Sequence, residues 1–306
     1  MKVKIAKTIA LVFALFPATC LAETLTSYSV APSIWAIEGP AEQRNPENLA
    51  NNATFGLVET LEGAVLIDPG GTWKGAAHLH SVVRDLTNQP VVFVINTGGQ
   101  DHRWLGNGYW KAQGATIVAS SNAVQDQSER GSLQMTMLSQ LVEDELQGTE
   151  PVHADIVFDA EHILEVGERR IEIRHVAAAH TPGDSFVWLP QYDTVFTGDI
   201  VYVGRILGVM SFSDTASWLE AFAAIEALEP TNVVPGHGAP TTLYQAQADT
   251  RDYLINLRNA MRTYIDEGGD VVGSVDIDQS DFSYLDQFDA LARRNAQTAF
   301  EQMEWE

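Results

Sequence analysis

The sequence contains one cysteine in 306 residues, and that residue, Cys20, lies in a short N-terminal segment of distinct composition. Three lysines among the first seven residues are followed by an apolar run at 9–16 and by small residues up to Ala22. This pattern predicts a secretory signal peptide over residues 1–22, whose apolar run is too short to span a bilayer. Cleavage after Ala22 removes Cys20, so we predict a periplasmic protein with no membrane anchor, disulfide or thiolate metal ligand in its mature form. Lipidation of Cys20 is disfavoured because Thr19 stands where a smaller residue is expected.

Basic residues are also scarce. The chain has 18 Lys and Arg against 41 Asp and Glu, a formal charge of -23, and loss of the signal peptide makes it more negative still. Because nucleic-acid binding draws most of its affinity from cationic contacts with phosphate, this charge argues against a nucleic-acid partner. We expect a small-molecule substrate. Solubility or a salty habitat would explain the same charge.

After residue 22 the sequence has no long apolar span, internal repeat or low-complexity tract. Its hydrophobic pattern predicts short strands and amphipathic helices in an order typical of two packed sheets covered by helices, an α/β fold. The expected strands lie at 26–37, 54–67, 91–95, 115–119, 156–158, 171–176, 186–189 and 194–196. The expected helices lie at 74–86, 104–111, 120–146, 216–228, 243–265 and 282–302. In the helix at 120–146 we expect Met135, Met137 and Leu141 to be core residues.

Four fragments carry a His or Asp beside a glycine or proline at the end of an expected strand: 95–102, 179–184, 196–199 and 234–238. Strand ends are where a sheet presents ligands to a cleft. Each fragment alone has an ordinary structural explanation, since an Asp in a Thr-Gly-Asp turn can cap the turn and a lone His is usually structural. Their joint occurrence makes a shared site the better interpretation.

In this order the fragments resemble the metallo-β-lactamase fold superfamily, whose first metal motif reads Asn-Thr-His-x-His-x-Asp-His. The resemblance covers about residues 30–240, and the run 180–185 looks most like periplasmic zinc metallohydrolases associated with sulfur oxidation and quinoprotein systems. It implies an αββα four-layer sandwich at 23–241. The C-terminal helices at 242–306 would then pack on this domain or on a second subunit, and the oligomeric state stays open.

The first metal motif departs from the family pattern. Between Thr97 and Asp101 the family has four residues, two of them histidines, whereas this chain has only Gly98, Gly99 and Gln100. The resemblance implies a first metal site built from the missing histidines and His180. It implies a second site from Asp101, His102 and His237, with Asp199 bridging the two. The second site is therefore complete and the first is not, so we expect one metal ion, with space for substrate or water beside the glycines.

The family implies zinc, although manganese and iron accept the same nitrogen and carboxylate ligands. We expect a hydrolase that uses a metal-bound hydroxide on an ester, thioester, lactone or amide bond, with Asp101 orienting the water and His180 as general base. A β-lactam is not favoured, because the sequence has no specific β-lactam-binding signature. The alternative is a non-catalytic metal-binding protein or pseudoenzyme of the same fold, which the two lost ligands and the permissive glycines favour. Redox chemistry at iron is a third possibility.

Several further residues keep two interpretations. Asp68 looks like the family's aspartate that orients a metal ligand, and it can equally cap its turn. Arg205 meets either an anionic substrate group or a structural ion pair. The segment 39–52 either overhangs the cleft or is a solvated connector. His78 and His80 lie two apart on a helix and point away from each other, so we do not assign them to a metal. A role in the cleft is also open for His175, which belongs to the strand before His180.

Overall fold

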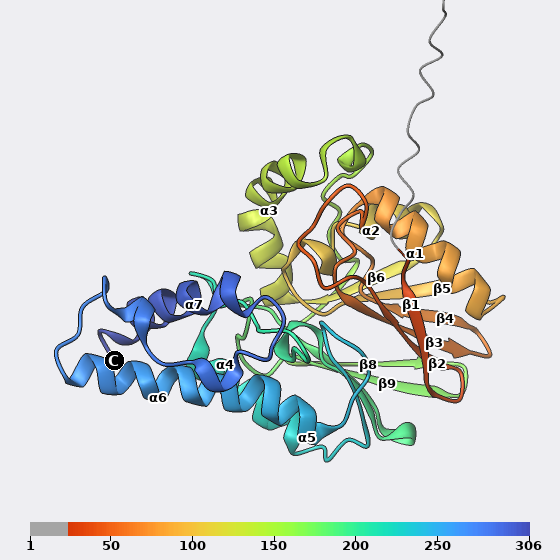
Figure 1. The fold of residues 1–306 in the computed structure, drawn as a ribbon. Coiled ribbons are helices and arrows are strands. Elements are labelled where there is room, and N and C mark those ends of the chain that lie inside the picture. Colours follow the sequence, from red (N-terminus) through yellow and green to blue (C-terminus); the bar gives the residue numbers. More distant parts are fainter. Residues whose placement is uncertain (1–23) are drawn as a thin grey trace, which may run out of the picture.

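The computed structural model describes residues 24–306, and the expected signal peptide lies outside them. Two sheets form the centre of the molecule, with strand orders β1-β2-β3-β4-β5-β6-β7 and β12-β11-β10-β9-β8. Helices cover the outer faces of both sheets, which confirms the αββα sandwich (Figure 1). No helix within residues 24–306 is long and apolar enough to cross a membrane.

The first sheet begins with antiparallel strands and continues with parallel ones. Its strands are β1 (Thr26–Ala31), β2 (Ile34–Glu38), β3 (Thr54–Thr60), β4 (Gly63–Ile67), β5 (Val91–Asn96), β6 (Thr116–Ser120) and β7 (Ile156–Phe158). The strands of the second sheet are β8 (Glu161–Val166), β9 (Arg169–Arg174), β10 (Phe186–Leu189), β11 (Thr194–Phe196) and β12 (Asn232–Val234).

The helices are α1 (Trp73–Leu86), α2 (Asn107–Ala112), α3 (Ser121–Leu141), α4 (Thr215–Glu226), α5 (Leu243–Ala246), α6 (Asp252–Asp266) and α7 (Phe288–Met303). Side chains between the sheets form one apolar core, to which β5 contributes Ile95 and β11 contributes Phe196. A second core lies under α1 and α2, and a third joins α4, α6 and α7 to the second sheet. The C-terminal helices therefore pack on the body of the same chain. Burial of these apolar faces is the main stabilising contribution.

Two expected C-terminal helices differ from their predicted bounds. The segment 243–265 is interrupted by a π-helical stretch at Gln247–Arg251, where the buried Asp249 accepts hydrogen bonds from the Gly204 N–H and the Tyr284 hydroxyl. The last helix begins at Phe288 instead of 282, since Asp286 pairs through its backbone with Gly204 and Ile206. Both changes arise from contacts between distant segments, which helical periodicity does not report.

The helix predicted at 120–146 ends at Leu141, because Glu143 adopts a positive φ of 51°. Of its three expected core residues, Met135 and Leu141 pack against the buried Trp104 and Leu138. The expectation for Met137 is wrong, because 51% of its surface is exposed. Leu133, one turn earlier on the same face, is 60% exposed.

Candidate metal centre

The four fragments singled out in the sequence meet at one edge of the sandwich. His102 follows β5, His180 precedes β10, Asp199 follows β11 and His237 follows β12. The two sheets pack face to face, so the ends of β5, β11 and β12 open onto the same space. All four side chains are buried.

Three of these side chains lie close enough together to bind one metal ion. One atom each from His102, Asp199 and His237 lies within 4.8 Å of the others. The His102 Nε2 atom is 3.3 Å from Asp199 Oδ2, and His237 Nε2 is 3.2 Å from Asp199 Oδ1. The His102 Nε2 and Asp199 Oδ2 atoms are buried and have no hydrogen-bond partner. Two imidazole nitrogens and a carboxylate oxygen fit a divalent cation such as zinc, which would relieve these two orphaned atoms.

An arginine that the sequence analysis missed lies beneath this cluster. Arg103 is fully buried, and its Nη2 donates to Asp199 Oδ1 at 2.7 Å and to the Gly236 carbonyl at 2.8 Å. Its Nη1 donates to Asp68 Oδ2 at 2.7 Å. Burial would raise the pKa of Asp199, but Arg103 and His102 hold that pKa well below its usual value. The carboxylate is therefore ionised and can serve a cation.

The structure also decides the role of Asp68. Besides Arg103, its carboxylate accepts hydrogen bonds from the backbone N–H and the hydroxyl of Thr97. Asp68 thus connects the end of β4 to the start of the metal loop and orients Arg103. The position of Arg103, directly after His102, was the sequence signal that could have revealed this ion pair.

Asp101 does not join the cluster formed by His102, Asp199 and His237. Its Oδ1 accepts hydrogen bonds from Arg44 Nε at 3.0 Å and from the His102 backbone N–H at 2.8 Å. The same oxygen is 3.2 Å from His102 Nδ1. Burial would raise the pKa of Asp101, but Arg44 and His102 lower it below its usual value. Asp101 is therefore placed to orient His102, an arrangement common behind metal-bound histidines.

Arg44 shows that the segment 39–52 reaches the site. Its Nη2 is 2.9 Å from His102 Nδ1 as well as bonded to Asp101. An arginine only donates hydrogen bonds, so this contact favours a lone pair on Nδ1. A histidine that binds a cation through Nε2 carries its proton on Nδ1 instead. This Nδ1–H group can donate a hydrogen bond to Asp101. When His102 binds a cation through Nε2, its Nδ1 no longer accepts a hydrogen bond from Arg44. Arg44 then pairs with Asp101 alone.

His180 stands apart from the cluster in the same pocket. Its Nδ1 lies 2.9 Å from the carbonyl oxygen of Gly208, which can only accept, so Nδ1 carries the proton and Nε2 has the lone pair. The rings of Tyr202, Phe212 and Trp218 surround it edge-on. Burial lowers the pKa of His180 to about 4. The imidazole is neutral at pH 7, and it is a weaker base than the sequence argument assumed.

The expected space beside the glycines is filled by side chains. A Cβ on Gly98 would lie 2.3 Å from Asp184 Oδ1, and a Cβ on Gly99 would lie 1.8 Å from Asp126 Oδ2. The carbonyl oxygens of Gly98 and Gly99 accept hydrogen bonds from the side chains of Gln127 and Gln134. The two glycines therefore allow close packing of a fixed loop, and the prediction of open space and of a permissive loop was wrong. Gln100, unlike them, faces the pocket.

A pocket of 180 Å³ opens onto His102, His180 and His237. One wall is an apolar face of α3, formed by the exposed Leu133 and Met137 and by the partly buried Leu141. Arg205 lines the pocket and its Nη1 is 3.3 Å from His237 Nδ1. Within residues 24–306 Arg205 has no carboxylate within 4.0 Å, so the ion pair considered for it is absent from the described chain.

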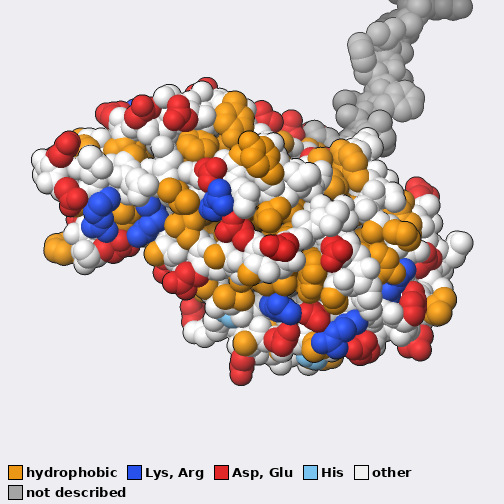
Figure 2. Space-filling model, turned by 90° about the horizontal axis from the view of Figure 1, so that it is seen from below, with side chains coloured by type: hydrophobic (Ala, Val, Ile, Leu, Met, Phe, Trp, Pro, Cys, Tyr) orange, Lys and Arg blue, Asp and Glu red, His pale blue; other side chains and the backbone are white. Residues whose placement is uncertain are grey.

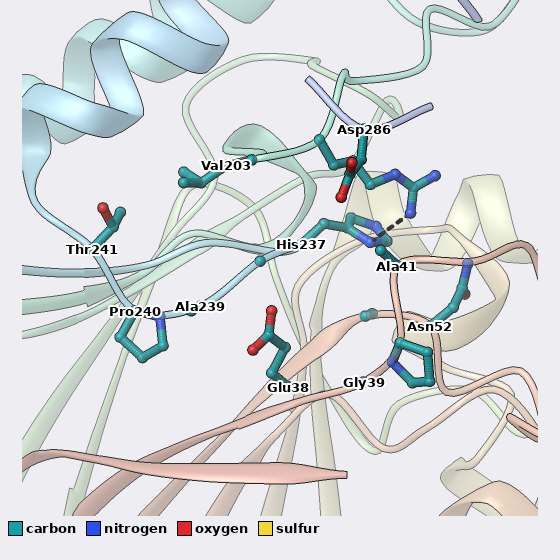
Figure 3. A pocket seen from close by; sticks show the side chains of 15 residues that line it. Glu38, Gly39, Ala41, Asn52, Val203, His237, Ala239, Pro240, Thr241 and Asp286 are labelled. Carbon is teal, nitrogen blue, oxygen red and sulfur yellow. Dashed lines mark hydrogen bonds between the residues drawn. The ribbon is translucent and has the colours of Figure 1, made fainter. Parts of the chain in front are cut away.

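A second, more polar hollow of 290 Å³ lies on the other side of His237. Figure 3 shows Glu38 and Asp286 directed toward this space and a hydrogen bond ending on the His237 ring. Arg205 and His237 line both hollows and so form the partition between them.

The remaining histidines lie outside the pocket. His80 contacts the Tyr109 hydroxyl at 2.8 Å, and His175 Nδ1 contacts the carbonyl of Asp184 at 2.8 Å. His153 stacks on Trp104, and His162 stacks on Phe158. Neither His78 nor His175 lines the pocket, so the cleft position considered for His175 is not found.

Comparison with known proteins identifies the family. A sequence model described as the Metallo-beta-lactamase superfamily matches residues 50–237, which is more than half of the chain. The protein therefore belongs to the metallo-β-lactamase superfamily, which generally carries metal-dependent hydrolases.

Solved structures share the fold at low sequence identity. A metallo-beta-lactamase from Pontibacter korlensis is 21% identical with a TM-score of 0.62, and the match covers 76% of this chain and 100% of that one. A stereoselective inverting sec-alkylsulfatase from Pseudomonas sp. is 17% identical with a TM-score of 0.71, covering 91% of this chain and 50% of that one. A metallo-beta-lactamase from Pseudomonas aeruginosa in its mono-zinc form is 19% identical with a TM-score of 0.59, covering 75% and 95%.

Proposed function

We propose that this protein is a hydrolase that binds a single divalent cation at His102, Asp199 and His237. The observation that carries the proposal is the pair of orphaned atoms, His102 Nε2 and Asp199 Oδ2, which face each other 3.3 Å apart in a buried site. Leaving two such atoms unsatisfied costs about 1–3 kcal/mol each, and a cation would offset that cost. Three protein ligands with an open position are typical of catalytic zinc.

A single ion is favoured because the place of the two missing histidines is filled. Asp184 and Asp126 pack against Gly98 and Gly99, which leaves His180 without partners for a second ion. The similar enzyme from Pseudomonas aeruginosa is described in a mono-zinc form, which fits the same stoichiometry. Zinc is the favoured metal, and manganese or iron would suit the same nitrogen and carboxylate donors.

The bound cation would supply Lewis acidity, lowering the pKa of a water molecule and polarising the bond to be cleaved. The chain itself orients the reactants. Arg103 holds Oδ1 of Asp199 so that Oδ2 stays free, and Asp101 holds the His102 ring. His180 presents the lone pair of Nε2 to the pocket and is placed to accept a proton. We propose an ester, thioester, lactone or amide as the bond cleaved.

The second candidate is a non-catalytic protein of the same fold. It is favoured by the arginines Arg44 and Arg205, whose guanidinium groups lie 2.9 Å and 3.3 Å from Nδ1 of His102 and His237. Both contacts favour the tautomer that does not bind a cation through Nε2. Against this candidate, possible ligand atoms of His102, Asp199 and His237 all lie within 4.8 Å of one another. We also propose that the chain is exported to the periplasm after removal of residues 1–22 and that it acts on a small molecule.

The test compares metal content and turnover in matched variants. The protein is purified from zinc-supplemented culture, its metal is counted by mass spectrometry, and generic esters, thioesters, lactones and amides are assayed. We expect about one ion per chain, as in three-ligand catalytic sites, and loss of both ion and turnover in His237→Ala. His78→Ala is the control, because His78 is half-exposed on α1 and outside the pocket. A wild-type protein that contains no metal and is inert on every substrate would contradict the proposal.

A further inference from the structure

The charged residues that line the pocket beside the metal centre are mainly basic, whereas the protein as a whole is strongly acidic. The chain has 41 acidic and 18 basic residues, and Figure 2 shows basic side chains as a few separate spots on a face with many acidic ones. In the pocket the balance is opposite, because Asp101 is its one carboxylate and four arginines line it: Arg44, Arg130, Arg205 and Arg294. Such a local concentration of cations attracts anions.

Two of these arginines lack a counter-charge. Arg44 pairs with Asp101, and Arg130 pairs with Asp126. Among residues 24–306, neither Arg205 nor Arg294 has a carboxylate within 4.0 Å. The Nε atom of Arg205 is buried without a hydrogen-bond partner. Arg205 is partly buried, and a guanidinium shielded from water without a counter-charge is costly, so an anionic ligand that binds Arg205 offsets this cost.

The unpaired cation lies next to the metal centre. Arg205 Nη1 is 3.3 Å from Nδ1 of His237, so an anion bound to Arg205 would lie close to a residue that we assign to the metal. Without a cation the formal charges of the side chains at the centre sum to zero. The negative charges belong to Asp68, Asp101 and Asp199, and the positive charges to Arg44, Arg103 and Arg205. A divalent ion therefore leaves the site positive, which adds to the preference for an anion.

The rest of the pocket is apolar. Leu133, Met137 and Leu141 recur every four residues and form one face of α3. Met210, Phe212 and Leu291 line the same pocket from the second sheet side and from α7. Leu133 and Met137 are 60% and 51% exposed, and large apolar side chains gathered at a cleft mark a binding surface. The volume of 180 Å³ is smaller than the roughly 300 Å³ at which pockets for drug-sized ligands begin. The pocket is therefore large enough for the polar head group of a ligand, and the apolar face of α3 can bind an aliphatic chain attached to it.

We propose that the substrate is an anionic amphiphile, whose negative group binds Arg205 and Arg294 and whose aliphatic chain lies along Leu133, Met137 and Leu141. This inference deepens the proposed hydrolase by naming its substrate class. Its binding part stands without catalysis, because the arginines and the apolar face belong to the protein itself. The head group is a sulfonate, sulfate, carboxylate or phosphonate. Each of these has oxygen atoms that accept bidentate hydrogen bonds from a guanidinium.

The experiment measures binding of inert ligands by isothermal titration calorimetry, with zinc-loaded and chelator-treated protein. The probes are n-alkyl sulfonates, carboxylates and phosphonates of four to ten carbons, with n-alkanols of equal length as neutral controls. We expect anions to bind at least 10-fold more tightly than alkanols, as for hydrogen bonds to charged groups. Affinity should rise up to about fourfold for each methylene that is buried. The tightest of the three anionic series identifies the head group.

Two matched pairs of variants assign the two ends of the ligand. Arg294→Gln should reduce the preference for anions about 3-fold or more, whereas Arg293→Gln, which removes a neighbouring exposed arginine outside the pocket, should not. Leu133→Ser should weaken the dependence on chain length, whereas Leu61→Ser, at a 78% exposed leucine elsewhere, should leave it unchanged. Arg205→Met should abolish the preference for anions.

Equal affinity for alkanols and anions, or affinity independent of chain length, would overturn the proposal. The result is separate from the fate of the proposed hydrolase. Binding of anionic amphiphiles by a protein that hydrolyses nothing would support the binding part of this inference and favour the non-catalytic candidate. Hydrolysis of neutral, short substrates without binding of amphiphiles would support the hydrolase and overturn this inference.

Discussion

The Nη2 atom of Arg103 lies 2.7 Å from Oδ1 of Asp199, and both side chains are fully buried. Arg103 is thereby joined to Asp199 on one side and to Asp68 on the other. Burial would lower the pKa of Arg103, but the two carboxylates raise it above its usual value, so the guanidinium stays charged. One oxygen of Asp199 is committed to this ion pair and the other faces His102. The arginine thus fixes the orientation of the carboxylate that we assign to the metal.

Replacement of Arg103 by methionine should destabilise the protein strongly. It leaves Asp68 and Asp199 buried without a cation, and breaking a buried ion pair in this way costs about 3–5 kcal/mol of unfolding free energy. Urea denaturation measures the change. The control is Arg293→Gln, since Arg293 pairs with Asp276 where both side chains are about two-thirds exposed, and it should change stability by less than about 0.5 kcal/mol. A loss below about 1 kcal/mol for Arg103→Met would show that the ion pair is not a structural requirement.

Asp101→Asn should weaken metal binding without removing the site. If Asp101 orients His102 through Nδ1, the variant still binds one ion, with an affinity reduced about 10- to 100-fold. Competition with a chromophoric chelator gives the affinity and the stoichiometry together. Complete loss of stoichiometric metal would instead make Asp101 a direct ligand, as the sequence resemblance implied.

His180→Ala should abolish turnover and leave the bound metal near the wild-type amount. The His180 imidazole lies outside the group of ligand atoms that approach within 4.8 Å of one another, while it lines the same pocket. Loss of a general base typically reduces the rate by about 10²- to 10⁴-fold. The measurements are metal content and kcat on whichever substrate the wild type hydrolyses. If metal is lost with the imidazole, His180 is a ligand and not a base.

Asp184→Asn should stabilise the protein increasingly as pH rises. Burial, together with Asp199, raises the pKa of Asp184 well above its usual value of 3.8. A carboxyl whose folded-state pKa is raised binds more protons when folded than when unfolded, so stability falls as pH rises from about 4 through the folded pKa. Asparagine mimics the protonated form, accepting from the Thr181 N–H and donating to the Thr181 hydroxyl. Urea denaturation at pH 5 and pH 8 should show a larger advantage for the variant at pH 8. A difference independent of pH would contradict the assignment.

Gly99→Ala should destabilise the metal loop. The added methyl group would lie 1.8 Å from Asp126 Oδ2, and overpacking of this kind costs about 1–3 kcal/mol. Gly108→Ala is the matched control, because its nearest neighbour, a methyl of Val152, is at an ordinary contact distance of 3.5 Å. In α2 that substitution should be neutral or stabilise by up to about 1 kcal/mol. Thermal unfolding of the two variants separates the outcomes, and equal stability would mean that the loop is not tightly packed against α3.

Most strands of the sandwich followed from local sequence, although β8 (Glu161–Val166) and β12 (Asn232–Val234) were not among the expected strands. Runs such as Val91–Asn96 are apolar and β-branched, and each of the expected strands corresponds to one or two strands of the fold. The ligand turns were predictable for the same reason, because a His or Asp beside a glycine at a strand end is visible in the chain. What local sequence did not report was the neighbourhood of each side chain. Nothing in the local sequence distinguished Arg103, and the glycines were expected to border open space, because the partners Asp199 and Asp126 are distant in sequence.

The sequence by itself determined most of the strands and their order along the chain, because hydrophobic period and turn residues act over a few positions. It also placed His102, His180, Asp199 and His237 in the segments that follow or precede strands. Only the tertiary structure decided which of them converge. In the folded chain His102, Asp199 and His237 lie together, and Asp101 forms an ion pair with Arg44. Met137, expected in the core, lines the pocket. Those outcomes depend on distances between segments that are far apart in the chain. The packing of the two sheets and of α3 sets these distances, and no local pattern encodes them.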